Sequence, residues 1–325
     1  MFGELIAILA VLTFVASNVI FRKTENEASP TFINFFRTGI GTLTFFLLVG
    51  FFNSFNLIFM VPWELWLLLI LSFVFGQVIG DTAYFSAQKV LGTTISLAIS
   101  MTFPLFTFIF SLIFLNQRFE LNLIISLILI AIGIIIIGNS KKNSEISEYK
   151  DDIGSNNSIR TQTHDRFPRT IIKSIGFCFI ASLGWAIGAV IIEFTIGKID
   201  FIIQNQELSS IIGNVIRFPF AFLILGVMVL RDQNLGKNDE NIVLRKKTKR
   251  TWILLIIASI LGTSIGAFLY TEGIHLAGAN IMSLIASASP LFALPLTYFF
   301  NKETISKIGF IGVVFTILGV MIILI

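Results

Sequence analysis

Two segments of this chain, residues 76–106 and 262–292, resemble each other along their whole length without a gap. A shift of 186 residues superposes them, since 262 − 76 = 186. Self-similarity at a fixed spacing indicates that one structural unit occurs twice. The identical pairs at this shift include Gly76/Gly262, Gly80/Gly266, Tyr84/Tyr270, Gly92/Gly278, Ile95/Ile281, Ile99/Ile285, Pro104/Pro290, Leu105/Leu291 and Phe106/Phe292, and outside the segments Trp66/Trp252 and Gly133/Gly319.

The composition identifies the medium in which this unit folds. Apolar residues make up 55% of the 325 residues and charged residues 13%, and the mean hydropathy is +0.89. Soluble domains are roughly 45–50% apolar. We therefore expect a multi-pass protein of the plasma membrane, with the lipid bilayer as its surroundings. The single cysteine, Cys178, excludes an intramolecular disulfide and a cysteine-built metal cluster, and its apolar surroundings favour a small buried hydrophobic residue.

Apolar stretches of about 20 residues, the length that crosses a bilayer as a helix, determine the expected fold. Because each stretch must satisfy its own backbone hydrogen bonds within lipid, helix is the only structure that fits. We predict an all-α integral membrane protein with ten transmembrane helices. Their approximate spans are 4–21, 31–52, 63–88, 92–115, 121–139, 172–196, 208–230, 251–275, 279–300 and 305–325.

The repeat divides these spans into two five-helix halves, residues 1–139 and 172–325, joined by a polar linker at 140–171. An odd number of crossings forces the second half to enter the membrane from the opposite side. Such inverted repeats enclose a central site in many secondary transporters. Composition favours a solvated, disordered linker.

A second polar loop, 231–250, ends in a basic cluster that marks a cytoplasmic helix flank or, alternatively, a contact with anionic lipid. Lys and Arg outside the expected helices concentrate in the loops on one side of the membrane. The positive-inside rule makes that side cytoplasmic and places both termini outside.

Two arginines lie at corresponding places in the two halves. Arg37 and Arg217 each follow an asparagine, Asn34 or Asn214, by three residues, which is about one helical turn. A mid-membrane arginine costs roughly 2.5–3.5 kcal/mol on insertion scales and normally faces a partner or a wet cavity. Arg217 is near the expected midplane, so we interpret it as a site residue. Arg37 is closer to a helix end and is either a site residue or an interfacial anchor.

The helix expected over 63–88 carries a polar stripe at helical spacing, formed by Gln77, Asp81, Tyr84 and Gln88. An aspartate within a membrane helix predicts a functional site, with Arg37 or Arg217 as its partner; a purely structural ion pair is the alternative. The glycine pairs in the two repeated segments favour close helix packing.

The carboxylates break the symmetry of the repeat. Asp81 corresponds to Ala267, and Glu272 corresponds to Ser86. Packing alone gives no reason for this asymmetry, whereas a carrier needs gates and a pocket that differ. The further residues expected to line the pocket are Asn18, Trp185, Tyr84 and Tyr270, whose aromatic rings suit a cation or an apolar group.

Pro104 and Pro290 lie in the middle of corresponding helices, within spans 92–115 and 279–300. A mid-span proline removes a backbone hydrogen bond and permits a kink. The sequence leaves two interpretations open, a static kink and a hinge that moves during transport.

Catalytic and metal-binding patterns are absent from the sequence. Neither His164 nor His275 has ligand spacing to another histidine, a cysteine or a carboxylate cluster. There is no phosphate-binding loop. We therefore expect neither an enzyme nor a bound metal or cofactor, and no nucleic-acid partner.

With ten expected helices in two halves, an Asn-x-x-Arg start to the second helix of each half, and a glycine followed by Pro-Leu-Phe in each repeated segment, the chain resembles the EamA-like family of the drug/metabolite transporter superfamily. The resemblance covers the chain except for the two polar loops. It departs at a Gly-Glu-basic turn that the family often has, where this chain has residues 116–118 and 302–304. The resemblance implies a central cavity between the halves and cytoplasmic termini, opposite to the charge count, so absolute orientation stays open.

The resemblance also implies a secondary carrier, commonly an exporter of amino acids or other small metabolites. In such a carrier Arg37 and Arg217 would bind anionic groups of a small-molecule substrate. Asp81 and Glu272 would pair with them, with a substrate amine or with a coupling proton. Two alternatives remain: a cation or drug exporter of the same superfamily, and a membrane scaffold that transports nothing. Oligomeric state, substrate and direction lie beyond the sequence.

Overall fold

A computed structural model of the chain describes residues 2–114, 166–235, 247–302 and 306–323, with isolated positions between 125 and 136. Every regular element that it describes is helical. In chain order the elements are α1 Phe2–Arg22, α2 Pro30–Phe51, α3 Phe55–Met60, α4 Trp63–Phe73, η1 Val74–Asp81, α5 Thr82–Leu91, α6 Thr93–Ser100, α7 Phe103–Phe114, α9 Arg166–Ile203, α10 Gln206–Leu235, α11 Lys249–Ser259, η2 Ile260–Ile265, α12 Gly266–Ala277, α13 Ala279–Ala286, α14 Ser289–Asn301 and α15 Lys307–Ile323.

The described helices confirm an all-α protein with several membrane-spanning segments. Within the described ranges, seven stretches are long and apolar enough to cross a membrane. The expected span 121–139 lies almost entirely outside the described residues, so the full set of ten stays a prediction. The seven stretches are Phe2–Arg22, Pro30–Phe51, Trp63–Leu91, Thr93–Phe114, Arg169–Ile203, Leu208–Asp232 and Lys249–Ala277.

Two of these stretches change their helical winding part-way. A π-helical segment, η1, joins α4 to α5, and a second one, η2, joins α11 to α12. They begin at Val74 and Ile260, which are 186 residues apart (260 − 74 = 186), the spacing of the sequence repeat. Wide helical turns of this kind are frequent at functional sites. The apolar pattern of the sequence did not predict them.

A glycine ends each of these two stretches. Gly92 has φ 83° and ψ 166°, and Gly278 has φ 87° and ψ 157°. Only glycine adopts this backbone region without strain, because a Cβ atom would collide with neighbouring backbone. The paired glycines therefore fix the turn into the next helix in both places.

The helices expected over 92–115 and 279–300 are each broken in two. α6 ends at Ser100 and α7 begins at Phe103, while α13 ends at Ala286 and α14 begins at Ser289. Pro104 and Pro290 are each the second residue of the new helix. This corrects the expectation of a proline inside one kinked helix. In the first turn no intrahelical N–H is needed and the fixed φ of proline suits the helix, so the chain restarts there.

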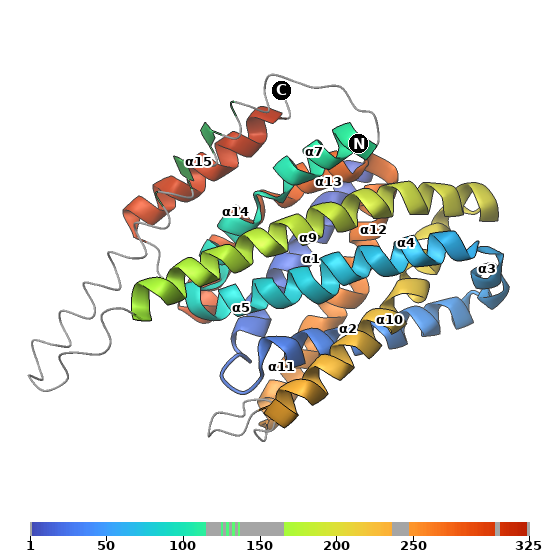
Figure 1. The fold of residues 1–325 in the computed structure, drawn as a ribbon, viewed down its shortest axis with the longest axis horizontal. Coiled ribbons are helices and arrows are strands. Elements are labelled where there is room, and N and C mark those ends of the chain that lie inside the picture. The colour runs from blue at the N-terminus through green and yellow to red at the C-terminus, as the bar shows by residue number, and fades with distance from the viewer. Residues whose placement is uncertain are drawn as a thin grey trace, which may run out of the picture.

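Close packing brings distant segments together around α9, which at 38 residues is longer than the expected span 172–196. It begins at Arg166, so the end of the expected linker is helical. α9 packs on η1 and α5, and α4 runs beside it across Figure 1. A Cβ at Gly184 would clash with the carbonyl oxygen of Phe75, and one at Gly188 would come within 2.9 Å of the Ser72 carbonyl oxygen. Glycine at these positions lets the two backbones touch.

Two further sets of contacts join helices that are distant in the sequence. α1 packs on α12 and η2, and α2 packs on α10. Ring contacts such as Phe45–Phe218 fill the space between α2 and α10. On the outside, large apolar side chains such as Phe59, Phe201 and Phe299 are exposed. An outer surface of this kind suits contact with lipid.

Candidate functional site

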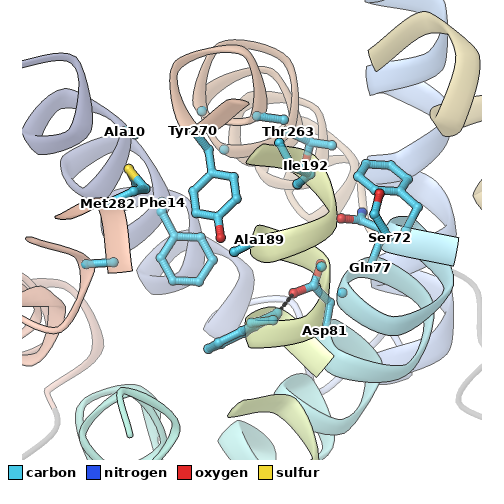
Figure 2. A pocket seen from close by; sticks show the side chains of 18 of the residues that line it. Ala10, Phe14, Ser72, Gln77, Asp81, Ala189, Ile192, Thr263, Tyr270 and Met282 are labelled. Carbon is cyan, nitrogen blue, oxygen red and sulfur yellow. Dashed lines mark hydrogen bonds between the residues drawn. The ribbon is translucent and has the colours of Figure 1, made fainter. Parts of the chain in front are cut away.

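A cavity of about 130 Å³ lies among helices from both ends of the chain. α1, α2, α4 and η1 contribute to its wall, together with α7, α9, α10, η2, α12 and α13. Figure 2 shows Phe14, Asp81 and Tyr270, from three different helices, turned toward this space. Most of the wall is aromatic or aliphatic, and its charged residues are Arg37, Asp81 and Arg217.

Arg37 is bound by several neighbours in its own half of the chain. Its side chain is buried, and the guanidinium forms an ion pair with the Asp81 carboxylate. Its Nε donates to Asn34 Oδ1 at 3.1 Å, and an Nη2 hydrogen donates to Gln77 Oε1 at 3.2 Å. The Phe85 ring lies over the guanidinium at 5.0 Å. The buried side chain of Arg37 does not extend to the protein surface, and Asp81 pairs with Arg37 instead of Arg217.

Asp81 is engaged through both carboxylate oxygens. Oδ2 accepts from Arg37, and Oδ1 accepts from the indole N–H of Trp185 at 2.8 Å. The Asn34 amide donates to the Gln77 carbonyl oxygen at 2.6 Å and thereby links α2 to a carbonyl of the π-helical segment. The wide turn η1 thus positions Gln77 and Asp81 against α2. Trp185 attaches the same carboxylate to α9.

Arg217 is buried as deeply but has a different set of neighbours. It is 1% exposed, and the Phe73 ring lies 4.3 Å from its guanidinium carbon. Nε and Nη2 donate to Asn214 Oδ1 at 3.0 and 2.6 Å, and Nη2 also donates to Thr271 Oγ1 at 2.6 Å. Its Nη1 has no hydrogen-bond partner among the residues that the structure describes. No carboxylate within the described ranges forms an ion pair with it.

The sequence repeat explains why the two arginines differ. At the 186-residue shift, Gln77 corresponds to Thr263 and Asp81 to Ala267. The amide that accepts from Arg37 and the carboxylate that neutralises it are therefore replaced, at the corresponding positions of the second half, by a short hydroxyl and a methyl group. Arg217 keeps a positive charge, because arginine stays protonated in proteins, without a counterion in the described part of the chain.

The remaining sequence-predicted residues divide between the cavity and its surroundings. Gln77, Trp185 and Tyr270 line the cavity, while Asn34 and Asn214 hold the two arginines from outside its wall. Tyr84 is behind the wall: its ring is 5.4 Å from the Trp185 ring and its hydroxyl donates to Gln88 at 2.6 Å. Tyr84 and Tyr270 are therefore repeat mates with different surroundings.

Glu272 and Asn18 lie away from the cavity wall. Glu272 accepts from the Ser210 hydroxyl at 2.6 Å and has His275 Nδ1 at 3.9 Å. Asn18 is fully buried, and its side-chain amide has no hydrogen-bond partner among the described residues. The expectation that these two side chains share a pocket with the arginines does not fit this arrangement.

Sequence reasoning missed several residues of the site. Phe14 and Phe73 line the cavity, as does Thr263, and Thr271 binds Arg217. A signal existed for Thr263, since it occupies the repeat position of Gln77. The described ranges hold no cluster of three or more His, Cys, Asp or Glu side chains suited to a metal ion.

Comparison with known proteins identifies the family of this chain. The EamA-like transporter family model matches residues 1–139 and 172–325, which together form most of the chain. The chain belongs to the EamA-like transporter family. This multi-pass EamA-like transporter is 23% identical, over 98% of its own length and 97% of the relative's, to a protein of Archaeoglobus fulgidus described as an uncharacterized transporter.

The fold of this EamA-like transporter also occurs among solved structures. A crystal structure, described only as that of a protein, matches it with a TM-score of 0.64 over 99% of this chain and 95% of that one. The identity is 13%, so the match shows the fold alone.

Proposed function

We propose that this chain is a secondary active transporter that exports small metabolites, such as amino acids, by alternating access between two inverted five-helix halves. The observation that carries the proposal is the cavity among membrane-spanning helices. Arg217 belongs to its wall and has an Nη1 without a hydrogen-bond partner among the described residues. Buried polar groups are normally hydrogen-bonded, and an exception calls for an explanation such as a ligand. A substrate that enters the cavity supplies the missing partner.

Repetition of local structure supports two halves that act as related bodies. The π-helical segments, the positive-φ glycines and the helix breaks before Pro104 and Pro290 recur in matching order along the chain. Packing is also reciprocal, since α1 contacts α12 while α9 contacts η1 and α5. Rocking of one half against the other would open the cavity to each side in turn. The two breaks before the prolines are the candidate hinges.

Asp81 is the best candidate for coupling to a proton. It faces the cavity and holds Arg37 by charge, so a proton on its carboxylate would weaken that ion pair. The contacts between η1, α2 and α9 would then change together, because Asp81 binds Arg37 and Trp185 at once. A change that alters interhelical contacts is the kind that switches a two-state protein.

The other functions left open by the sequence fit the site less well. A cation exporter needs an accessible carboxylate, whereas both Asp81 oxygens are engaged and Glu272 lies with Ser210. A scaffold needs no cavity with charged residues on its wall. The geometry therefore favours a carrier in which arginine takes part in substrate binding.

A direct test uses the purified chain in two steps. A thermal-shift screen against pools of metabolites identifies ligands, because a ligand stabilises the state that it binds. Flux of each ligand is then measured in proteoliposomes. We expect Arg217→Ala and Asp81→Asn to abolish flux while the protein still elutes as a folded species. Arg169→Ala, at an exposed position of α9, is the control and should retain flux.

The outcomes separate transport from the site. If no ligand is found and no solute crosses the membrane, the proposed transport is wrong. If Arg217→Ala and Asp81→Asn both keep normal flux, the assignment of the site is wrong and transport itself stands.

A further inference from the structure

We propose that the cavity selects a small anion with an apolar body and no ammonium group, bound through Arg217. This inference rests on the proposed function, in which the cavity is the substrate site, and it narrows the substrate class. The proposed ligand differs from a zwitterionic amino acid, the substrate that the family resemblance alone would suggest.

The charges on the cavity wall favour a net anion. Arg37 and Asp81 form an ion pair and contribute no net charge, whereas Arg217 contributes one positive charge. A buried, unpaired charge is costly, and a bound ion of opposite sign removes that cost. One carboxylate, or another singly charged anionic group, completes this neutralisation.

Unpartnered polar atoms mark where the anion would bind. Arg217 Nη1 and Thr263 Oγ1 both belong to residues of the cavity wall, and within the described ranges neither has a hydrogen-bond partner. Thr263 is 2% exposed, so water outside the protein does not satisfy it. Asn214, outside the cavity wall, accepts from Arg217, and its own amide nitrogen has no hydrogen-bond partner in the described part of the chain. Guanidinium N–H groups bind anionic oxygen through short, strong hydrogen bonds.

The same wall offers no comparable place for an ammonium group. Both oxygens of Asp81 are engaged, and Glu272 does not line the cavity. Aromatic faces such as those of Phe14 and Tyr270 attract a cation by only about 0.5–2 kcal/mol. An amino acid would therefore bury its ammonium group without a carboxylate partner, whereas its deaminated analogue would not.

Cavity size and lining describe the rest of the ligand. A water molecule needs roughly 10–15 Å³ of such space, and the cavity measures about 130 Å³. It therefore has room for a solute of roughly ten non-hydrogen atoms. Phe14, Phe103 and Met282 on the wall suit an apolar body.

The test compares ligands that share a body and differ in charge. One set is 4-methylpentanoate, leucine and 3-methylbutylamine; the other is 3-phenylpropionate, phenylalanine and 2-phenylethylamine. Binding to the purified chain in detergent is measured by thermal shift and calorimetry. We expect at least one anion to bind about tenfold more tightly than the zwitterion and the amine of its set, a difference of about 1.4 kcal/mol.

A matched pair of variants tests whether Arg217 causes the preference. Ala267→Asp places a carboxylate at the repeat position of Asp81, where it would neutralise Arg217, and Ala267→Asn adds an uncharged side chain of the same size. We expect the Asp variant to bind the preferred anion about tenfold more weakly than the Asn variant. The melting temperatures of the unliganded variants show that both are folded. Arg217→Gln should lose the preference as well.

Three outcomes would overturn the inference: equal binding of the zwitterion or the amine, equal anion binding by the two Ala267 variants, or no binding of either anion. Flux in proteoliposomes keeps these outcomes apart from the proposed function. Transport of leucine without a preference for the anion leaves the carrier in place and removes the inference. Binding of the anion without flux of any solute keeps the inference about the ligand and removes the proposed transport.

Discussion

Arg37 and Arg217 occupy corresponding positions three residues after an asparagine, yet Arg37 is neutralised by Asp81 and Arg217 is not. Ala267 stands where a second aspartate would complete the symmetry. In the proposed carrier this difference gives the two halves different tasks, because Arg37 already has a counterion and Arg217 would take one from the ligand.

Removal of one partner from the buried pair should be more harmful than removal of both. Asp81→Leu leaves Arg37 buried without a counterion, which costs about 3–5 kcal/mol. The double variant Arg37→Met/Asp81→Leu should lose less stability than Asp81→Leu alone, because no uncompensated charge remains. Reversible unfolding in mixed detergent micelles gives the free energies for the cycle. Additive effects within about 0.5 kcal/mol would show that the two side chains do not interact.

The indole N–H of Trp185 should matter separately from its ring. Trp185→Phe keeps an aromatic ring near Phe14 and Tyr84 but removes the donor to Asp81 Oδ1. Hydrogen bonds to charged groups are worth about 1.5–3 kcal/mol, so unfolding free energy should fall by that amount. Trp66→Phe is the matched control, since no hydrogen bond of its indole is found in the described part of the chain. Equal losses in the two variants would contradict a special role for the Trp185 N–H.

Close approach of α9 to η1 should fail when a methyl group is added at Gly184. Its Cβ would clash with the Phe75 carbonyl oxygen, a backbone atom that cannot move aside cheaply. We expect Gly184→Ala to lower the melting temperature and to reduce the free energy of unfolding by about 1–3 kcal/mol. Gly176→Ala, in the same helix with nothing within 4 Å of the added Cβ, should be neutral or slightly stabilising. A Gly184→Ala protein as stable as Gly176→Ala would mean that the helices are not in contact there.

The turn between α12 and α13 should require glycine for its backbone and not for space. An added Cβ at Gly278 would lie 3.5 Å from Glu193 Oε1, an ordinary contact, but φ is 87°. Gly278→Ala should therefore cost about 1–3 kcal/mol of stability through backbone strain. Gly50→Ala, with a similar contact to Phe55 at 3.6 Å and a helical backbone, is the control and should not destabilise the protein. A neutral Gly278→Ala result would show that the turn relaxes.

The sequence located most helices because apolar length is a local property. Spans 31–52, 208–230 and 251–275 each match a described membrane-spanning stretch to within a few residues at both ends. The repeat likewise anticipated the equivalence of Gly92 and Gly278. By contrast, the expected span 172–196 is shorter at both ends than α9, Arg166–Ile203. The breaks before Pro104 and Pro290 were also read as kinks, because the first turn of a restarted helix and the middle of a bent one look alike in sequence.

The site was predictable as a set of residue types but not as an arrangement. Intramembrane charge is expensive, so Arg37, Asp81 and Arg217 could be selected from the sequence alone. Which carboxylate faces which arginine depends on how η1 lies against α2 and α9. For the same reason Tyr270 lines the cavity while its repeat mate Tyr84 contacts Gln88 behind the wall.

The amino-acid sequence alone determined that the chain is helical, spans a membrane and contains a repeated unit. Hydropathy and self-similarity are properties of the sequence and need no tertiary structure to be recognised. Only the folded arrangement decided that Arg37 pairs with a carboxylate, whereas Arg217 forms no ion pair within the described ranges. That difference depends on side chains from separate helices meeting at hydrogen-bonding distance, and interhelical packing sets such distances.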